Sequence, residues 1–95
     1  MNKIITTLRK FNHEREWEQF HTFENLVKSI SIESSELLEC FQWGYCNNYH
    51  EIKNEISDIF IYLLILCDKF DMGEKQIKEN IYKKIEMNAK KYPVK

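Results

Sequence analysis

Four carboxylates stand in two pairs at one-turn spacing, and they are the residues of this chain best suited to chemistry. Glu33 and Glu36 form one pair, and Glu55 and Asp58 form the other. Residues three apart on a helix are surface neighbours, so each helical pair would present two acids side by side. Two such helices packed antiparallel would bring four carboxylates together, where each like-charge contact at ~4–6 Å costs on the order of 3–4 kcal/mol at an effective dielectric of ~20. A divalent cation that prefers oxygen ligands is the simplest compensation.

The sequence around each pair is apolar. Glu33 falls between Ile30 and Leu37 on one predicted helix, and Glu55 has the same kind of neighbours on the next. An unpaired buried carboxylate is costly and normally takes up a proton. The alternative is that all four acids are solvated and pair with nearby lysines. Two pairs in adjacent apolar segments favour the metal site.

Neither acidic pair contains a histidine, which favours Mg²⁺, with Mn²⁺ as a possible substitute, over zinc. Two other metal sites are weaker alternatives. Cys40, Cys46 and His50 fit no common zinc spacing and lack a fourth ligand. A ferritin-like di-iron site requires two Glu-x-x-His motifs, and only Glu18-x-x-His21 occurs.

The elements that must position these acids are predicted to be helices. The chain has 95 residues, which predicts one domain over residues 1–95. Two glycines and one proline leave little for hairpin turns, and this favours an all-α fold. Apolar periodicity predicts four helices, with Thr22 as the N-cap of the second and Gly44 at its end. Their expected ranges are 3–16, 23–43, 51–70 and 74–92.

The third predicted helix is apolar nearly all round, which is typical of a helix buried on every side. A four-helix domain of this size cannot surround one of its own helices. We therefore expect a four-helix bundle-like domain that assembles into homodimers or homotetramers. The residues expected to face inward on the first and fourth helices are Ile4, Leu8, Phe11, Ile77, Ile81 and Ile85.

The net charge of −1 hides two regions of opposite sign. Residues 12–58 carry ten acids and three bases, whereas residues 72–95 carry seven lysines and three glutamates. This distribution suits metal and phosphate better than a nucleic-acid surface, which requires a broad basic face. The longest apolar run, residues 59–67, is too short to span a bilayer, and we expect no membrane partner. Three cysteines without disulfide spacing and no secretory signal predict a cytoplasmic protein.

The basic last helix supplies a complement to the acids. Lys84, Asn88 and Lys91 are spaced i, i+4, i+7 and share one face, which could hold phosphate oxygens. The alternative is a solvated lysine-rich helix. Trp17 and Trp43 flank the acidic helix, and either indole could stack on a base, although their spacing alone is more typical of core aromatics.

Four ordered blocks of the sequence resemble the MazG-like all-α nucleoside triphosphate pyrophosphohydrolases, and most of all their dCTP-pyrophosphatase branch. The first two blocks are Arg15–His21 with Asn25–Leu26 following, and Glu33–Trp43. The others are Glu55–Leu63 and Lys84–Pro93. Four blocks in order are far more specific than a single pair of glutamates.

The resemblance implies Mg²⁺-dependent hydrolysis of a nucleoside triphosphate, dCTP or a related pyrimidine nucleotide first, to the monophosphate and pyrophosphate. It implies four metal ligands: Glu33, Glu36, Glu55 and Asp58. It implies substrate contacts from Tyr62, Lys84, Asn88 and Lys91, with Trp17 and Trp43 beside the base. The nucleotide would lie between subunits, as in relatives.

The chain departs from the family at two places. Phe23-Glu24 replaces a Pro-Lys or Pro-Arg pair, and only eighteen residues, from Leu37 to Asn54, lie between the acidic pairs. Both changes concern substrate identity rather than the metal site.

As a mechanism, the acids would hold Mg²⁺ on the triphosphate and position a water for attack at the α-phosphorus. Glu33 and Glu36 are the candidate catalytic acids, and Glu33 is favoured as the base because it lies deepest in the apolar stripe. Lys84 would stabilise charge on the leaving pyrophosphate. The alternative is a catalytically silent module that senses nucleotide or binds a protein.

Overall fold

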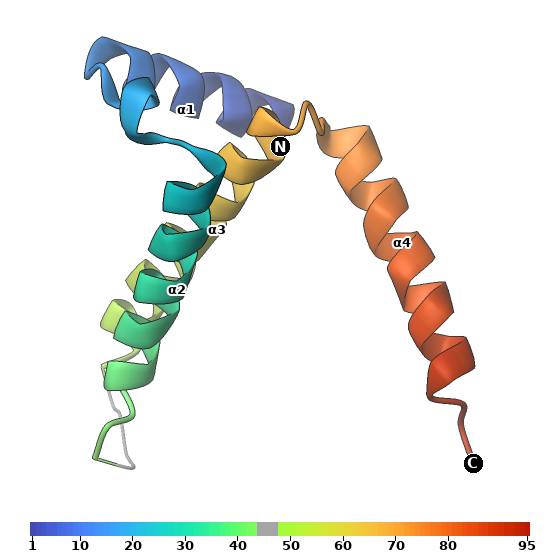
Figure 1. The fold of residues 1–95 in the computed structure, drawn as a ribbon. Coiled ribbons are helices and arrows are strands. Elements are labelled where there is room, and N and C mark those ends of the chain that lie inside the picture. The colour runs from blue at the N-terminus through green and yellow to red at the C-terminus, as the bar shows by residue number, and fades with distance from the viewer. Residues whose placement is uncertain (44–47) are drawn as a thin grey trace.

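The computed structural model describes residues 1–43 and 48–95, and all regular elements in that part of the chain are helical (Figure 1). In chain order they are α1 (Asn2–Glu14), a 3-10 turn η1 (Trp17–Phe20), α2 (Phe23–Glu39), α3 (Tyr49–Lys69) and α4 (Glu74–Lys91). The predicted all-α fold with four helices is confirmed. None of the described helices is both long and apolar enough to cross a membrane.

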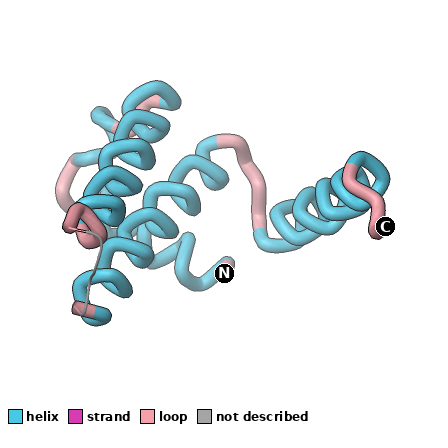
Figure 2. The backbone as a smooth tube through the Cα atoms, turned by 90° about the horizontal axis from the view of Figure 1, so that it is seen from below, coloured by secondary structure: helices cyan, strands magenta, loops and turns pink. Residues whose placement is uncertain are grey.

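Helices α2 and α3 lie side by side and antiparallel (Figures 1 and 2). The predicted N-cap of α2 is confirmed, because the Thr22 hydroxyl accepts a hydrogen bond from the Asn25 amide at 3.1 Å. The fully buried Leu26 lies one turn into α2. This hairpin is the scaffold for both acidic pairs.

The facing ends of α2 and α3 differ from the predicted ones. Helix α2 ends at Glu39, and Phe41 donates instead to the carbonyl three residues back, Leu38, at 2.9 Å, as in a turn. Helix α3 begins at Tyr49 because the Asn48 side chain caps it, accepting from the Glu51 amide at 3.1 Å. The predicted stop at Gly44 lies outside the described residues.

Helix α1 packs across the carboxyl-terminal half of α3 (Figure 1). Its buried residues are Ile5 and Asn12, with Leu8 half-buried between them. The predicted inward stripe was therefore wrong at Ile4 and Phe11, which are 51% and 42% exposed. The true stripe is shifted by one residue because α1 presents to α3 the face that contains Asn12.

An ion pair ties α1 to α3 at the edge of this contact. The Arg9 guanidinium donates two hydrogen bonds to Asp68, one of them from Nε to Oδ2 at 2.8 Å. The Arg9 charge lowers the pKa of Asp68, and Asp68 raises the pKa of Arg9 in turn. Because the guanidinium forms two hydrogen bonds with one carboxylate, the pair orients the two helices relative to each other as well as attracting them.

Helix α4 leaves the other three helices and extends away from them (Figures 1 and 2). The chain turns at Asp71, whose φ of 57° lies in the left-handed region. Ile77 joins the core with Ile5 and Leu64, and it is the only residue of α4 that is buried. The expected inward positions Ile81 and Ile85 are instead 54% and 56% exposed. That expectation is wrong for the single chain.

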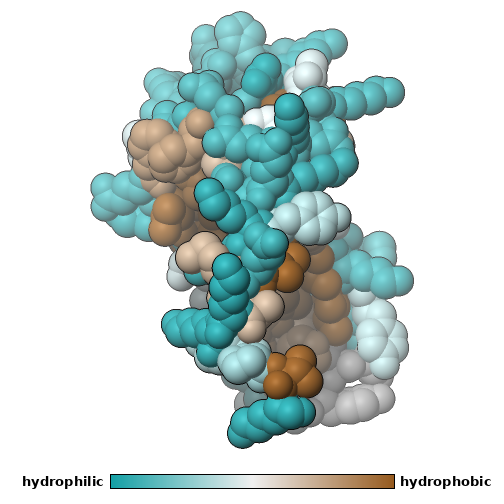
Figure 3. Space-filling model, turned by 90° about the vertical axis from the view of Figure 1, so that its right-hand side faces the viewer, coloured by the Kyte–Doolittle hydropathy of each residue, from teal (hydrophilic) through white to brown (hydrophobic). Residues whose placement is uncertain are grey.

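The single chain is open and apolar for its size. It exposes 8050 Å², whereas a compact monomer of 11.6 kDa would expose about 5,800 Å². Its radius of gyration is 16.1 Å, against about 12 Å for a compact domain of this length. Hydrophobic side chains interrupt the hydrophilic surface on the face shown in Figure 3. Helix α3 contributes Ile56, Phe60, Ile61 and Leu63 to the exposed apolar residues.

Candidate active site

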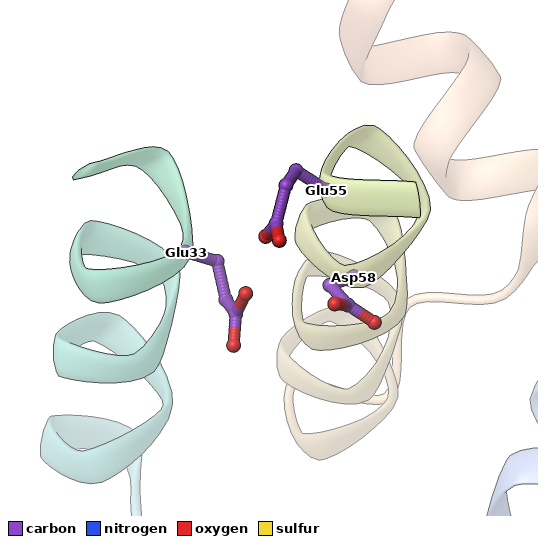
Figure 4. Close-up of side chains that lie close together, drawn as sticks. All are labelled: Glu33, Glu55 and Asp58. Atoms are coloured by element: carbon purple, nitrogen blue, oxygen red, sulfur yellow. The ribbon is translucent and has the colours of Figure 1, made fainter. Parts of the chain in front are cut away.

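Three of the four predicted acids meet between α2 and α3. Glu33 extends from α2 towards α3, Glu55 extends from α3 towards α2, and Asp58 lies on the next turn of α3 (Figure 4). One carboxylate oxygen from each lies within 4.8 Å of the others. Among the described residues, no other histidine, cysteine or acidic side chains converge in this way. We call these three residues the acidic cluster.

Two oxygens of the acidic cluster are buried without a partner. Glu33 Oε2 and Glu55 Oε2 are inaccessible to solvent and accept no hydrogen bond within the described part of the chain. Burial, followed by the nearby Glu36 carboxylate, raises the pKa of Glu33 to about 7. The same two causes raise the pKa of Glu55. The helix pair therefore holds negative charge where the protein alone does not stabilise it.

Glu36 lies beside the acidic cluster rather than in it. Its carboxylate is close enough to Glu33 and Glu55 to raise the pKa of both through hydrogen bonding and repulsion. It is not among the three residues whose oxygens lie within 4.8 Å of one another. The four acids predicted to converge thus form a group of three with a fourth at its edge.

The donors of the acidic cluster are all carboxylate oxygens, the ligands that Mg²⁺ and Mn²⁺ prefer. The orphaned oxygens of Glu33 and Glu55 fit such an ion, because a cation would stabilise both. For the alternative di-iron motif, Glu18 is already hydrogen-bonded to His13, with 2.9 Å between Oε1 and Nδ1. The alternative zinc ligand Cys46 lies outside the described residues.

An apolar cavity of about 240 Å³ lies between α1, η1 and α3. Trp17 and Tyr62 line it, and Trp17 packs edge-on against Phe11 with 5.5 Å between ring centroids. Tyr62 follows Asp58 by one helical turn, so the cavity and the acidic cluster lie along the same face of α3. The Cα atoms of the two residues are therefore separated by about 6 Å along the helix axis.

Two polar residues of this cavity were not among the predicted substrate contacts. His21 lines it, and burial followed by the Lys69 charge lowers the pKa of His21, which favours the neutral ring. Asn12 lines it as well and is only 7% exposed. A signal for Asn12 was present, because it continues the apolar stripe of Ile5 and Leu8 as a polar residue. The stripe assigned one residue away hid that signal.

Four other predicted contacts are not brought to the acidic cluster within one chain. Trp43 follows the carboxyl end of α2, is 87% exposed and does not line the cavity that contains Trp17. Lys84, Asn88 and Lys91 are exposed on α4, the helix that extends away from α2 and α3 (Figure 1). The described arrangement of one chain therefore does not place these residues at the acidic cluster.

A profile of the MazG-like family matches residues 28–95, which hold both acidic pairs and α4. The chain belongs to the MazG-like family. This confirms the resemblance that its sequence blocks indicated.

The curated relatives lie in the predicted branch of that family. The chain is 32% identical to dCTP pyrophosphatase 1 of Mus musculus, over 90% of this chain and 54% of the relative. It is 31% identical to dCTP pyrophosphatase 1 of Homo sapiens, over 88% of this chain and 54% of the relative. The chain thus spans about half the length of the curated relatives it matches.

A solved structure supports the fold over the whole chain. The crystal structure of a pyrophosphatase from Archaeoglobus fulgidus DSM 4304 superimposes with a TM-score of 0.88 and 39% sequence identity. The match covers 99% of this chain and 93% of the other. The arrangement of helices described above, including the extended α4, is therefore shared along nearly the full length of both chains.

Proposed function

We propose that this MazG-like protein hydrolyses a pyrimidine nucleoside triphosphate, dCTP or a close analogue first, to the monophosphate and pyrophosphate. One observation carries the proposal. The acidic cluster, with its two orphaned carboxylate oxygens, and the aromatic cavity lie one turn apart on the same face of α3. The names of the relatives, dCTP pyrophosphatase and pyrophosphatase, support the reaction class. A cytoplasmic location stays a prediction.

Glu33, Glu55 and Asp58 would hold Mg²⁺, or Mn²⁺ in its place, with Glu36 at the edge of the site. When bound, the ion supplies positive charge that neutralises the phosphates. Glu33 then accepts the proton of the attacking water, because its carboxylate lies within the apolar helix pair beside a second acid. Glu36 holds that water in line through its adjacent carboxylate.

The nucleotide would lie along α3, with its phosphates at the acidic cluster and its base in the cavity. Trp17 offers an indole surface for stacking, and Tyr62 lies between the two sites, where the sugar passes. The cavity volume of about 240 Å³ is below the ~300–1,000 Å³ of typical ligand pockets, which suits one base rather than a whole nucleotide.

A second copy of the chain would complete the site. Helix α4 places Lys84, Asn88 and Lys91 on an exposed face far from the acids of its own chain. The excess exposed surface of roughly 2,200 Å² per chain is larger than the ~800 Å² that each partner buries in a standard interface. We propose a homodimer or a homotetramer in which α4 brings these three polar side chains to the partner's phosphates and Trp43 brings its indole to the partner's base.

A phosphate-release assay tests the reaction directly. With Mg²⁺ and a panel of nucleoside triphosphates, malachite green should detect phosphate only after inorganic pyrophosphatase is added, because pyrophosphate is the leaving group. Asp58→Asn should lower kcat sharply because a charge facing the phosphates is lost. The matched control Glu14→Gln removes an exposed acid of α1 and should keep the wild-type rate. Nucleotide binding without any product would favour the silent sensing module instead.

A thermal-shift measurement tests the metal site without relying on activity. Mg²⁺ at ~100 times its Kd should stabilise the folded chain by roughly 2.7 kcal/mol and raise Tm by at least several degrees. Glu55→Gln should lose most of that shift, yet melt higher than wild type without metal because one buried repulsion is gone. A wild-type Tm that responds to neither Mg²⁺ nor Mn²⁺ would eliminate the metal site.

A further inference from the structure

Asn12 is the polar residue on the buried face of α1. It is 7% exposed, and it is the one polar residue among the buried ones in the described ranges 1–43 and 48–95. Its backbone carbonyl accepts a hydrogen bond from the Arg15 amide, and its side chain forms no hydrogen bond with the described residues. The fully buried side-chain oxygens without a partner belong to Glu33 and Glu55, so the Asn12 amide is still reached by solvent, and the side from which it is reached requires an explanation.

The position of Asn12 provides that explanation. The residue lines the cavity that also contains Trp17 and Tyr62, and apolar side chains such as Leu8 and Ile65 make up most of the remaining wall. Thr7 also lines the cavity, but its hydroxyl already donates to the Lys3 carbonyl at 2.9 Å. Asn12 therefore keeps both a donor and an acceptor available at a wall that is otherwise mainly apolar.

We propose that Asn12 is a specificity-determining residue that reads the Watson–Crick edge of a pyrimidine base held in this cavity. An amide presents an NH₂ donor beside a carbonyl acceptor, and this pair matches the adjacent donor and acceptor on the edge of a pyrimidine. Stacking on Trp17 holds a base but hardly distinguishes one base from another. The amide adds a pair of directional hydrogen bonds to the base edge, which stacking lacks. This inference rests on the proposed function and deepens it.

Asn12→Leu tests the inference, because leucine has a similar size and cannot form hydrogen bonds. A lost bidentate pair should lower kcat/KM for the preferred pyrimidine nucleotide by roughly 5- to 150-fold. It should leave the rate on inorganic tripolyphosphate unchanged, since that substrate has no base. The free variant should melt no lower than wild type, because Asn12 forms no side-chain hydrogen bond with the described residues that the change would remove. Thr6→Val, an exposed position of α1 outside the cavity, is the matched control and should change none of these values.

A binding measurement separates this inference from the proposed reaction. Calorimetry with deoxycytidine, which has no phosphate, should detect binding to wild type and a matching loss for Asn12→Leu. If the wild type hydrolyses no triphosphate but binds deoxycytidine through Asn12, the proposed reaction fails and the inference stands. If hydrolysis occurs and Asn12→Leu keeps the same base preference, or if the variant melts lower or fails to fold, Asn12 is a structural residue and the inference is overturned.

Discussion

At the scale of single residues, the acidic cluster keeps carboxylates where the protein alone does not stabilise them. Glu33 Oε2 and Glu55 Oε2 have no hydrogen-bond donor, and the Glu36 carboxylate adds repulsion to both. Because these carboxylates lack donors and repel one another, they must lower the free energy of unfolding of the metal-free protein. This decrease is greatest when the acids are ionised, so it should depend on pH.

Glu33 sets the direction of that dependence. Its pKa of about 7 in the folded chain lies above the ordinary glutamate pKa of 4.5 expected when the chain is unfolded. The folded state therefore binds more protons between those values, and metal-free stability falls as pH rises through them. In EDTA, wild-type Tm should drop by several degrees relative to Glu33→Gln between about pH 5.5 and pH 8. The lowered pKa of His21 acts in the opposite direction, so the difference between the two proteins is the quantity to measure.

Glu24→Gln is the control for this comparison, because Glu24 is exposed and pairs with Lys28 at 3.0 Å on the surface. Its Tm should follow the wild-type curve. Parallel curves for wild type and Glu33→Gln would mean that Glu33 ionises as an ordinary solvated acid.

At the scale of elements, the sequence predicted the helices well and their facing surfaces less well. The Thr22 cap follows from residue type. The burial on every side that was expected of α3 is not found in the single chain, where Leu64 is the one buried residue of this helix. The stripe of α1 could not be placed to one residue, because Ile4 and Ile5 are equally apolar and only packing on α3 selects Ile5. The same shift hid Asn12. Helix ends were displaced where local hydrogen bonds, such as the Asn48 cap, extended or shortened a helix.

The crossing of α1 and α3 depends on the Arg9–Asp68 pair, because it is the side-chain hydrogen bond that joins them. Arg9→Met should lower Tm by only a few degrees at fixed protein concentration, because the Arg9 side chain is 64% exposed and its charge is screened by solvent. The lowered pKa of Asp68 keeps this contribution complete at neutral pH, and the contribution is lost only as pH falls through that pKa.

Lys10→Met is the matched control for Arg9→Met. Lys10 lies next to Arg9 on α1 and pairs with Glu14 within the same helix at 3.9 Å, with both side chains mostly exposed. Such pairs contribute a few tenths of a kcal/mol, so Tm should change little. Equal decreases in Tm for the two variants would show that the inter-helix pair stabilises the chain no more than a surface pair within one helix.

At the scale of the whole molecule, the single chain holds only part of the site that its sequence predicts. The acidic cluster could be predicted because the spacing of its residues places them on one helix face, and the packing of α2 on α3 then brings them together. The placement of α4 could not be predicted from its apolar stripe of Ile77, Ile81 and Ile85. Such a stripe indicates that the helix face is buried, but it does not indicate whether the covering surface belongs to the same chain or to a second copy. Only Ile77 is buried within its own chain.

A mixing experiment tests whether a second copy completes the site. Asp58→Asn damages the acidic cluster, and Lys84→Ala removes a cation from α4, so each variant alone should hydrolyse dCTP slowly. If α4 acts on a partner, subunit exchange creates some sites with intact acids from one chain and an intact α4 from the other. The mixture should then be several times more active than either variant at the same total concentration. Light scattering on the wild type should give at least twice the 11.6 kDa of one chain.

Glu55→Gln mixed with Asp58→Asn is the control for that recovery. Both changes damage the acidic cluster of their own chain, so exchange cannot rebuild a complete set of acids and activity should stay low. A mixture of Asp58→Asn and Lys84→Ala that remains as slow as its components, although light scattering shows exchanged dimers, would mean that α4 serves its own chain. Helix α4 would then have to fold back onto α2 and α3, and the burial of Ile81 and Ile85 would be intramolecular. A wild-type mass of one chain at micromolar concentration would lead to the same conclusion without the mixing experiment.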